Sequence, residues 1–174
     1  MAIKANDIIR LNKEIIEELK IELTKQGHSL TGKTFNTMRS VVFIEGNTVV
    51  MEAHGSKVIA ILNYGVTADR IPYSPGAGSG QTTSKYIQGL KAYAKKRWGL
   101  SDKKALGAAF AIAHKQKEEG MPTKASYVYS ETGQRLGAID IVFKENTGTF
   151  DKRITDTLDL MLTQVFNQQK SEVI

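Results

Sequence analysis

The side chains best suited to chemistry near neutral pH are three histidines, His28, His54 and His114. Imidazole binds transition metals and moves protons in this range, but a metal site also needs further ligands at a compatible spacing. None of the three has a second His, Asp or Glu so placed. The chain contains no cysteine, which excludes disulfides, thiolate nucleophiles and cysteine-ligated metal centres. We therefore expect no metal and no cofactor.

The segment Pro75-Gly76-Ala77-Gly78-Ser79-Gly80-Gln81-Thr82 comes closest to a phosphate-binding loop. That motif begins with Gly and ends with Gly-Lys-Ser or Gly-Lys-Thr, whose lysine carries the charge that meets the phosphates. Here Pro75 stands at the first position and Gln81 at the position of the lysine. The sequence predicts a flexible loop rather than a nucleotide site.

Signatures of hydrolytic catalysis are missing as well. There is no Gly-x-Ser-x-Gly sequence, and the acidic pairs Glu17-Glu18 and Glu118-Glu119 lie on helix faces that we expect to be solvated. The sequence offers no residue for a catalytic role, so we expect a protein that is not an enzyme.

Charge is concentrated in one segment. Between Ser84 and Lys124 ten Lys or Arg residues face three acidic ones, a net charge of +7, whereas the rest of the chain has 14 basic and 15 acidic residues. The chain's +6 is therefore a property of this segment. A basic surface of this kind meets solvent, an acidic protein or nucleic acid.

The elements before this segment predict a helix followed by a hairpin. Apolar residues recur at steps of three and four from Ile8 to Leu23, which predicts an amphipathic helix with Asn6 or Asp7 as its cap and Gly27 at its end. Acidic side chains on its outer face (Glu14, Glu17, Glu18 and Glu22) are expected to be solvated. The runs 38–45 and 48–53, joined by Gly46-Asn47, predict two antiparallel strands. Residues 57–64 fit either a third strand or a short helix.

The later elements predict a loop and more helices. Residues 65–83 contain two prolines and four glycines, so we expect no regular element there. A basic helix at 84–98 ends at Gly99, and a second, capped by Ser101, runs to about Glu118. We expect the aromatic residues of the basic helix to serve the core. Residues 134–143 fit strand or helix, and the stripe Ile154, Leu158, Met161, Leu162 and Val165 predicts a C-terminal helix over 150–169.

Three segments in this order carry a resemblance to a known family. They are Leu30-Thr31-Gly32-Lys33 with the hairpin, Ile61-Leu62-Asn63-Tyr64-Gly65 with the Pro/Gly loop, and the helical pair that closes with Glu119-Gly120-Met121-Pro122. The arrangement resembles the head–tail joining and tail-completion (neck or tail-terminator) proteins of tailed bacteriophages, over about residues 30–122. That family commonly has an acidic residue where Asn63 stands, and its loop is shorter, so the role of the loop is not carried over.

The resemblance implies a structural virion protein without catalysis, assembled in the host cytoplasm as a ring that joins the head connector to the tail or closes the tail end. Its implied partners are copies of itself, portal or connector proteins, tail proteins and, non-specifically, DNA in the channel. We expect no membrane partner, because no apolar run is long enough to span a bilayer. We expect a single α+β domain over 1–174, in which terminal helices pack on a small antiparallel sheet. Its expected segments are the sheet portion 30–64, the loop 65–83, the basic helical pair 84–122 and the C-terminal helix 150–169.

The expected partner-binding surface combines the loop with the basic helical pair. Its candidate residues are Arg70, Tyr73, Lys91, Lys95, Lys96, Arg97, Lys103 and Lys104. In a ring, one basic surface can meet a different, acidic surface on the next copy, and the glutamates of the first helix are a candidate for it. The alternative is a nucleic-acid-binding protein that uses the basic helical pair 84–124.

Overall fold

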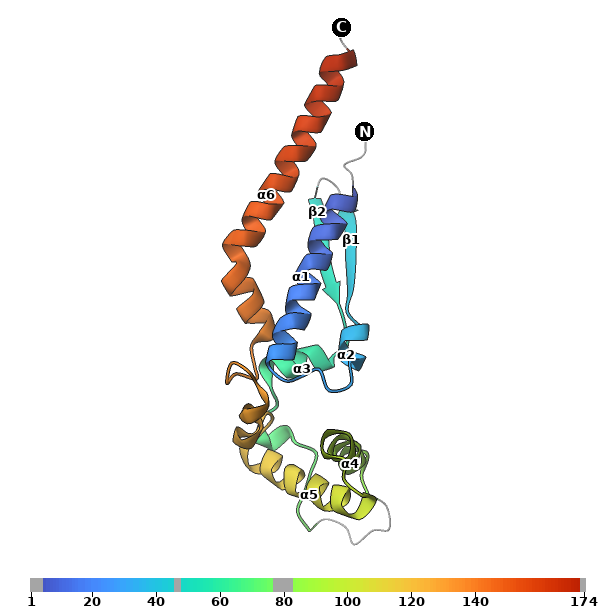
Figure 1. Cartoon of the computed structure of the whole chain (residues 1–174), viewed down its shortest axis with the longest axis vertical. Coiled ribbons are helices and arrows are strands. Elements are labelled where there is room, and N and C mark those ends of the chain that lie inside the picture. Colours follow the sequence, from blue (N-terminus) through green and yellow to red (C-terminus); the bar gives the residue numbers. More distant parts are fainter. Residues whose placement is uncertain (1–4, 46–47, 77–82, 173–174) are drawn as a thin grey trace. The chain divides into compact units, whose positions relative to one another are not determined.

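The computed structural model describes residues 5–45, 48–76 and 83–172, excluding the side chains of residues 5–7, 44, 49, 145–148, 161, 164–165 and 168–172. The Gly46-Asn47 connection and most of the glycine-rich loop therefore lie outside the described residues. Helices dominate, and a two-stranded antiparallel sheet accompanies them, which confirms the predicted α+β class (Figure 1).

The chain divides into two compact units. Unit 1 consists of residues 1–59 and 137–174, and unit 2 consists of residues 60–136. The single domain expected over the whole chain stays a prediction, and each unit is described by itself.

Unit 1 is built on helix α1 (Ala5–Lys25) and the strands β1 (Arg39–Glu45) and β2 (Thr48–His54). The apolar stripe predicted for α1 is buried from Ile8 to Leu23, and α1 lies along the hairpin (Figure 1). The Asn12 amide donates to the carbonyls of Val41 and Glu52, which are partners in the hairpin register, at 3.1 and 3.0 Å. A lone hairpin is marginally stable in water, so α1 supplies the missing support.

Three expectations for α1 need comment. The helix begins at Ala5, so Asn6 and Asp7 lie inside it and the prediction that either caps it is wrong. Its end at Gly27 is confirmed: that residue has φ +75°, a conformation that glycine adopts without strain. The glutamates do not form one solvated face, because Glu22 is buried and accepts a hydrogen bond from the Gln26 amide.

Helix α6 (Ala138–Glu172) completes unit 1. The predicted helix over 150–169 is confirmed, but it is longer than predicted, because the segment 134–143, which fitted strand or helix, enters the same helix from Ala138 onward. The helix packs on α1 with Ala138, Val142 and Phe150 buried. Arg153 then reaches Glu14 and Glu18 of α1 at 3.3 and 3.4 Å, which links the two helices by charge.

The remaining short elements are helical. Helix α2 (Lys33–Asn36) precedes the hairpin, and the segment that fitted strand or helix forms α3 (Val58–Tyr64). Two 3₁₀ helices, η1 (Ala68–Arg70) and η2 (Lys124–Tyr129), belong to unit 2. The expectation that residues 65–83 contain no regular element is wrong at η1 and at Val66, which forms an antiparallel bridge with Met121.

Unit 2 centres on helices α4 (Lys85–Trp98) and α5 (Asp102–Glu119), which lie side by side as predicted. The Ser84 hydroxyl accepts the Ile87 amide at 3.3 Å, and Gly99, with φ +64°, ends α4. Ser101 stands at the N-cap of α5, but its side chain makes no capping hydrogen bond, so that part of the prediction is wrong.

The packing between α4 and α5 depends on alanine. Ala94, Ala105, Ala109 and Ala113 are fully buried, and Ile87 packs with Ala109 and Ala113. Small side chains let two helix backbones approach closely, which leaves little room for any larger residue. The expectation that the aromatic residues of α4 serve the core holds in part: Tyr86 packs against the core, whereas Trp98 is exposed and meets Tyr93 edge-on.

Candidate assembly surfaces

The basic helical pair is partly neutralised from within. Lys91 and Lys95 of α4 contact the two carboxylate oxygens of Asp102, the first residue of α5, at 2.8 and 2.6 Å. Hydrogen bonds from Lys91 and then Lys95 lower the pKa of Asp102 to about 2. The carboxylate therefore stays charged at neutral pH and holds both lysines. Two of the eight candidate residues thus join helix to helix across the Gly99 turn.

A third candidate is held by an aromatic ring. The Arg97 guanidinium carbon lies 4.2 Å from the centre of the Tyr129 ring, a cation–π arrangement between α4 and η2. Arg97 is half-buried, so its charge is directed partly into unit 2. Sequence reasoning missed Tyr129 because its partner lies 32 residues away in the chain.

Lys95 is exposed despite its ion pair, and the candidates Lys96, Lys103 and Lys104 are exposed as well. Among the described residues none of these last three forms an ion pair. Lys103 and Lys104 occupy the first turn of α5, beside Asp102. Cations there oppose the helix dipole, so these lysines do not serve helix stability and remain available to a partner.

Arg70 and Tyr73 occupy different settings. Arg70 is exposed at the end of η1, whereas Tyr73 lies edge-on to His114 of α5, with ring centres 5.0 Å apart. The Lys117 amine donates to the Ile71 carbonyl at 3.3 Å, and the Ile71 side chain is buried. The first part of the predicted flexible loop is thus docked on α5, which corrects the expectation of an open loop. Residues 77–82 lie outside the described residues.

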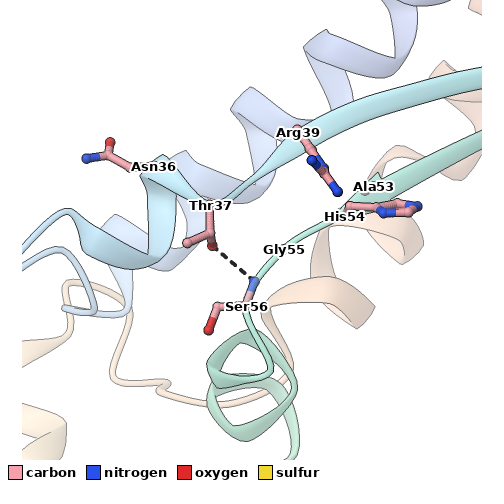
Figure 2. A pocket seen from close by; sticks show the side chains of 7 residues that line it. All are labelled: Asn36, Thr37, Arg39, Ala53, His54, Gly55 and Ser56. Atoms are coloured by element: carbon pink, nitrogen blue, oxygen red, sulfur yellow. Dashed lines mark hydrogen bonds between the residues drawn. The ribbon is translucent and has the colours of Figure 1, made fainter.

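An open depression of about 800 Å³ lies in unit 1 at one end of the hairpin (Figure 2). Polar side chains and backbone line it, from the end of α2 and the adjoining ends of the strands. The Thr37 hydroxyl accepts the Ser56 amide across it at 3.0 Å. Arg39 and His54, paired in the hairpin register, lie on one side of it (Figure 2). His54 contacts Glu52, outside the depression, so no acid–base pair is directed into it.

Several exposed apolar side chains belong to the distal part of α6. Phe150 is buried, and every later residue of α6 whose side chain is described is half-buried or exposed. Leu158, Leu162 and Phe166 are 44%, 68% and 69% exposed. The stripe that predicted this helix is therefore uncovered at Leu158 and Leu162, while Met161 and Val165 lie outside the described side chains.

The glutamates of α1, suggested as the acidic surface that would meet the basic one in a ring, mostly have contacts within the chain. Glu14 and Glu18 contact Arg153, Glu17 contacts Lys20 at 2.7 Å, and Glu22 is buried. Four carboxylates that the helical pattern placed on an outer face thus have partners on α1 and α6. An intersubunit contact through this face would have to displace those pairs.

The described part of the chain contains no group of three or more His, Asp or Glu side chains able to hold a metal ion. None of its described helices is long and apolar enough to cross a membrane. No protein-family model, no curated protein and no solved structure is significantly similar to the chain.

Proposed function

We propose that the protein is a structural subunit that forms a ring at the neck or tail end of a tailed bacteriophage, where it joins the head connector to the tail or completes the tail. Its partners would be copies of itself and the neighbouring connector and tail proteins, and its place of action the virion. The proposal combines the family resemblance of residues 30–122 with surfaces suited to assembly.

One observation carries the assembly part of the proposal: α6 continues past its last buried residue and presents leucines and a phenylalanine to solvent. Burying a leucine side chain contributes about 1.5–3 kcal/mol. Single exposed apolar residues are ordinary, but successive ones along a helix mark an interaction surface. An assembly would bury them, whereas an isolated chain gains nothing from them.

The small size of the sheet supports the same reading. The hairpin packs on α1 but has no third strand among the described residues, and Phe43 on β1 is exposed. A sheet with two free edges and an uncovered apolar side chain gains stability from a neighbouring molecule.

The alternative, a nucleic-acid-binding protein that uses residues 84–124, has less support. Lys91, Lys95 and Arg97 have intramolecular contacts, which leaves the exposed Lys85, Lys96, Lys103, Lys104 and Lys124 for phosphates. A few exposed lysines of this kind suit weak, non-specific binding, such as contact with DNA that passes through a ring.

The mass of the purified full chain in solution tests the assembly. Light scattering over a range of concentrations is expected to give a multiple of 19.2 kDa, and electron microscopy of the same sample is expected to show closed rings. A chain that stays monomeric at every concentration and also fails to bind phage connectors from its own source would contradict the proposal.

A further inference from the structure

Two arginines of unit 2 contact the same short helix, η2. The Arg97 guanidinium carbon lies 4.2 Å from the centre of the Tyr129 ring, and the Arg135 guanidinium donates from Nη1 to the Ser126 carbonyl at 2.8 Å. Ser126 and Tyr129 are one turn apart in η2, and both guanidinium side chains are half-buried. The fold of unit 2 therefore brings two positive charges to one helix, although they lie far apart in the sequence.

The surroundings of Arg135 disfavour its positive charge. Burial lowers the pKa of its guanidinium, and the nearby charge of Arg97 lowers this pKa further. Three tyrosine side chains act in the opposite direction, Tyr93, Tyr127 and Tyr129, yet the pKa remains lowered. An anion bound by both guanidiniums would offset the burial of the charges and their mutual repulsion.

The acidic residues on either side of η2 do not neutralise Arg97, which forms no ion pair among the described residues. Glu131, after η2, is exposed and forms no ion pair in the same part of the chain. Glu119, before η2, lies 3.7 Å from Lys115 and accepts a hydrogen bond from the Lys124 backbone amide. The charge of Arg97 therefore remains available to an anion from another molecule.

An exposed aromatic ring lies beside these cations. The Trp98 side chain is 42% exposed, and its ring meets the Tyr93 ring edge-on with centres 5.8 Å apart. Tyr93 covers at most one face of the indole, and the exposed fraction leaves a surface on which another flat ring can stack. Because Tyr93 is also close to Arg135, the indole and the guanidiniums belong to one region of unit 2.

We propose that Arg97, Arg135 and Trp98 bind a strand of unpaired nucleic acid, with a phosphate held by the two guanidiniums and a base stacked on the indole. Guanidinium groups suit phosphate because their planar donors can bind two oxygens at once. Stacking of bases on aromatic rings beside cations is the common mode of binding for single strands.

The exposed indole favours a single strand over the other anionic partners. Paired bases in a duplex are stacked on one another and offer no free face to the indole, and the carboxylates of an acidic protein do not require one. The site is also distinct from the exposed lysines of the basic helical pair, because Arg135 and η2 supply part of it. It lies within one chain, so the proposal does not depend on assembly into a ring.

Trp98 is the single tryptophan of the chain, so its fluorescence reports on the site directly. Titration of the full chain with a short oligothymidylate at low salt is expected to quench this emission in step with the rise in anisotropy of the labelled strand. A duplex of the same length and inorganic phosphate at the same phosphate concentration are expected to quench little. Strand binding without quenching, or equal quenching by the duplex or by phosphate, would overturn the proposal. Tighter binding of polyglutamate than of the strand would overturn it in favour of an acidic protein.

Two variants locate the binding. Arg97→Gln and Trp98→Leu are each expected to weaken strand binding, measured by anisotropy, by at least about fivefold. Lys57→Gln is the control: it removes the same charge as Arg97→Gln from an exposed position in unit 1 and should change the affinity by less than about twofold. Circular dichroism checks the fold, and exposed Trp98 provides a second variant should Arg97→Gln not fold.

Affinities of folded Arg97→Gln and Trp98→Leu equal to that of Lys57→Gln would overturn the proposal. A parent chain that assembles into rings but binds no strand would also overturn it and would leave the proposed function intact.

Discussion

The Lys95 ammonium lies 2.6 Å from one carboxylate oxygen of Asp102, and Lys91 lies 2.8 Å from the other. The cations come from the body of α4 and the carboxylate from the first turn of α5, where a negative charge also favours the helix dipole. One acidic residue therefore links two lysines of α4 to the start of α5 and offsets one of their two positive charges.

Asp102→Asn tests this arrangement through its pH dependence. Because the folded-state pKa of Asp102 is about 2, below the ordinary 3.8, its contribution to stability is present above about pH 4 and disappears as the pH falls toward 2. The parent chain is therefore expected to be slightly more stable than the variant at pH 6, with the difference vanishing near pH 2. Thermal unfolding at several pH values measures it.

Asp156→Asn is the control, since among the described residues Asp156 forms no ion pair. Its difference from the parent should change little over the same pH range. An Asp102→Asn difference that is the same at pH 6 and pH 2 would show that the carboxylate does not act through its charge.

Ala109→Leu should destabilise unit 2. Ala109 is fully buried between α4 and α5, and a larger side chain in a well-packed site typically costs about 1–3 kcal/mol. Denaturant unfolding gives the free energy. Ala111→Leu, on an exposed position of the same helix, is the matched control and is expected to be nearly neutral. Equal effects at the two positions would contradict close packing at Ala109.

Gly120→Ala should also destabilise unit 2, in this case through the backbone rather than through side-chain packing. Gly120 has φ +85°, and a Cβ atom there would lie 2.6 Å from the Val66 carbonyl oxygen, which belongs to the bridge with Met121. Gly89→Ala has the opposite expectation: this position in α4 has open space around it, and the exchange should stabilise by about 0.5–1 kcal/mol. The unfolding midpoints of both variants show whether stability falls for Gly120→Ala and rises for Gly89→Ala. A Gly120→Ala variant as stable as the parent would argue against the bridge between Val66 and Met121.

Arg153→Met should loosen α6 from α1. The change removes the cation shared by Glu14 and Glu18, and the expected cost is up to about 1 kcal/mol because Arg153 is partly exposed. Lys152→Met is the control: it removes the same charge one residue away, and Lys152 forms no ion pair among the described residues. Urea unfolding at low and high salt should show an Arg153 effect that shrinks with salt. The same loss in both variants would refute a specific contact.

DNA binding, if present, should depend on the exposed lysines. Reversing Lys103 and Lys104 together is expected to reduce the salt dependence of binding, since each phosphate contact contributes about 0.9 to the logarithmic slope on duplex DNA. Lys57→Glu, exposed in unit 1, is the control. Titrations of labelled duplex at several salt concentrations provide the slopes, and a complete lack of binding at low salt would remove the alternative function.

Local patterns predicted most elements because each has a local cause. The stripe of α1, the strands of the hairpin and the Ser84 and Gly99 boundaries of α4 all depend on residues within a few positions of one another. The boundaries of α6 did not follow from pattern. The segment 134–143 fitted strand or helix by pattern, yet α6 begins at Ala138 and runs through Gly148, where a glycine costs only about 1 kcal/mol.

The assembly surfaces were harder to predict than the elements. Basic composition correctly located the charged helices, but which lysines remain exposed depends on where Asp102 and Tyr129 lie in space. The same limit applies to the apolar stripe of α6. Its periodicity indicates one apolar face, and only the position of α1 reveals that the face is covered as far as Phe150 and uncovered beyond it.

The division of unit 1 into two chain segments has a consequence during synthesis. Unit 2 is one continuous stretch, so it can fold while the ribosome is still making the rest, whereas α1 emerges first and acquires its α6 cover only after all of unit 2 has been translated. In that interval the apolar side of α1 has only the hairpin to shield it. A nascent chain halted before Ala138 is therefore expected to bind chaperones more strongly than a finished one.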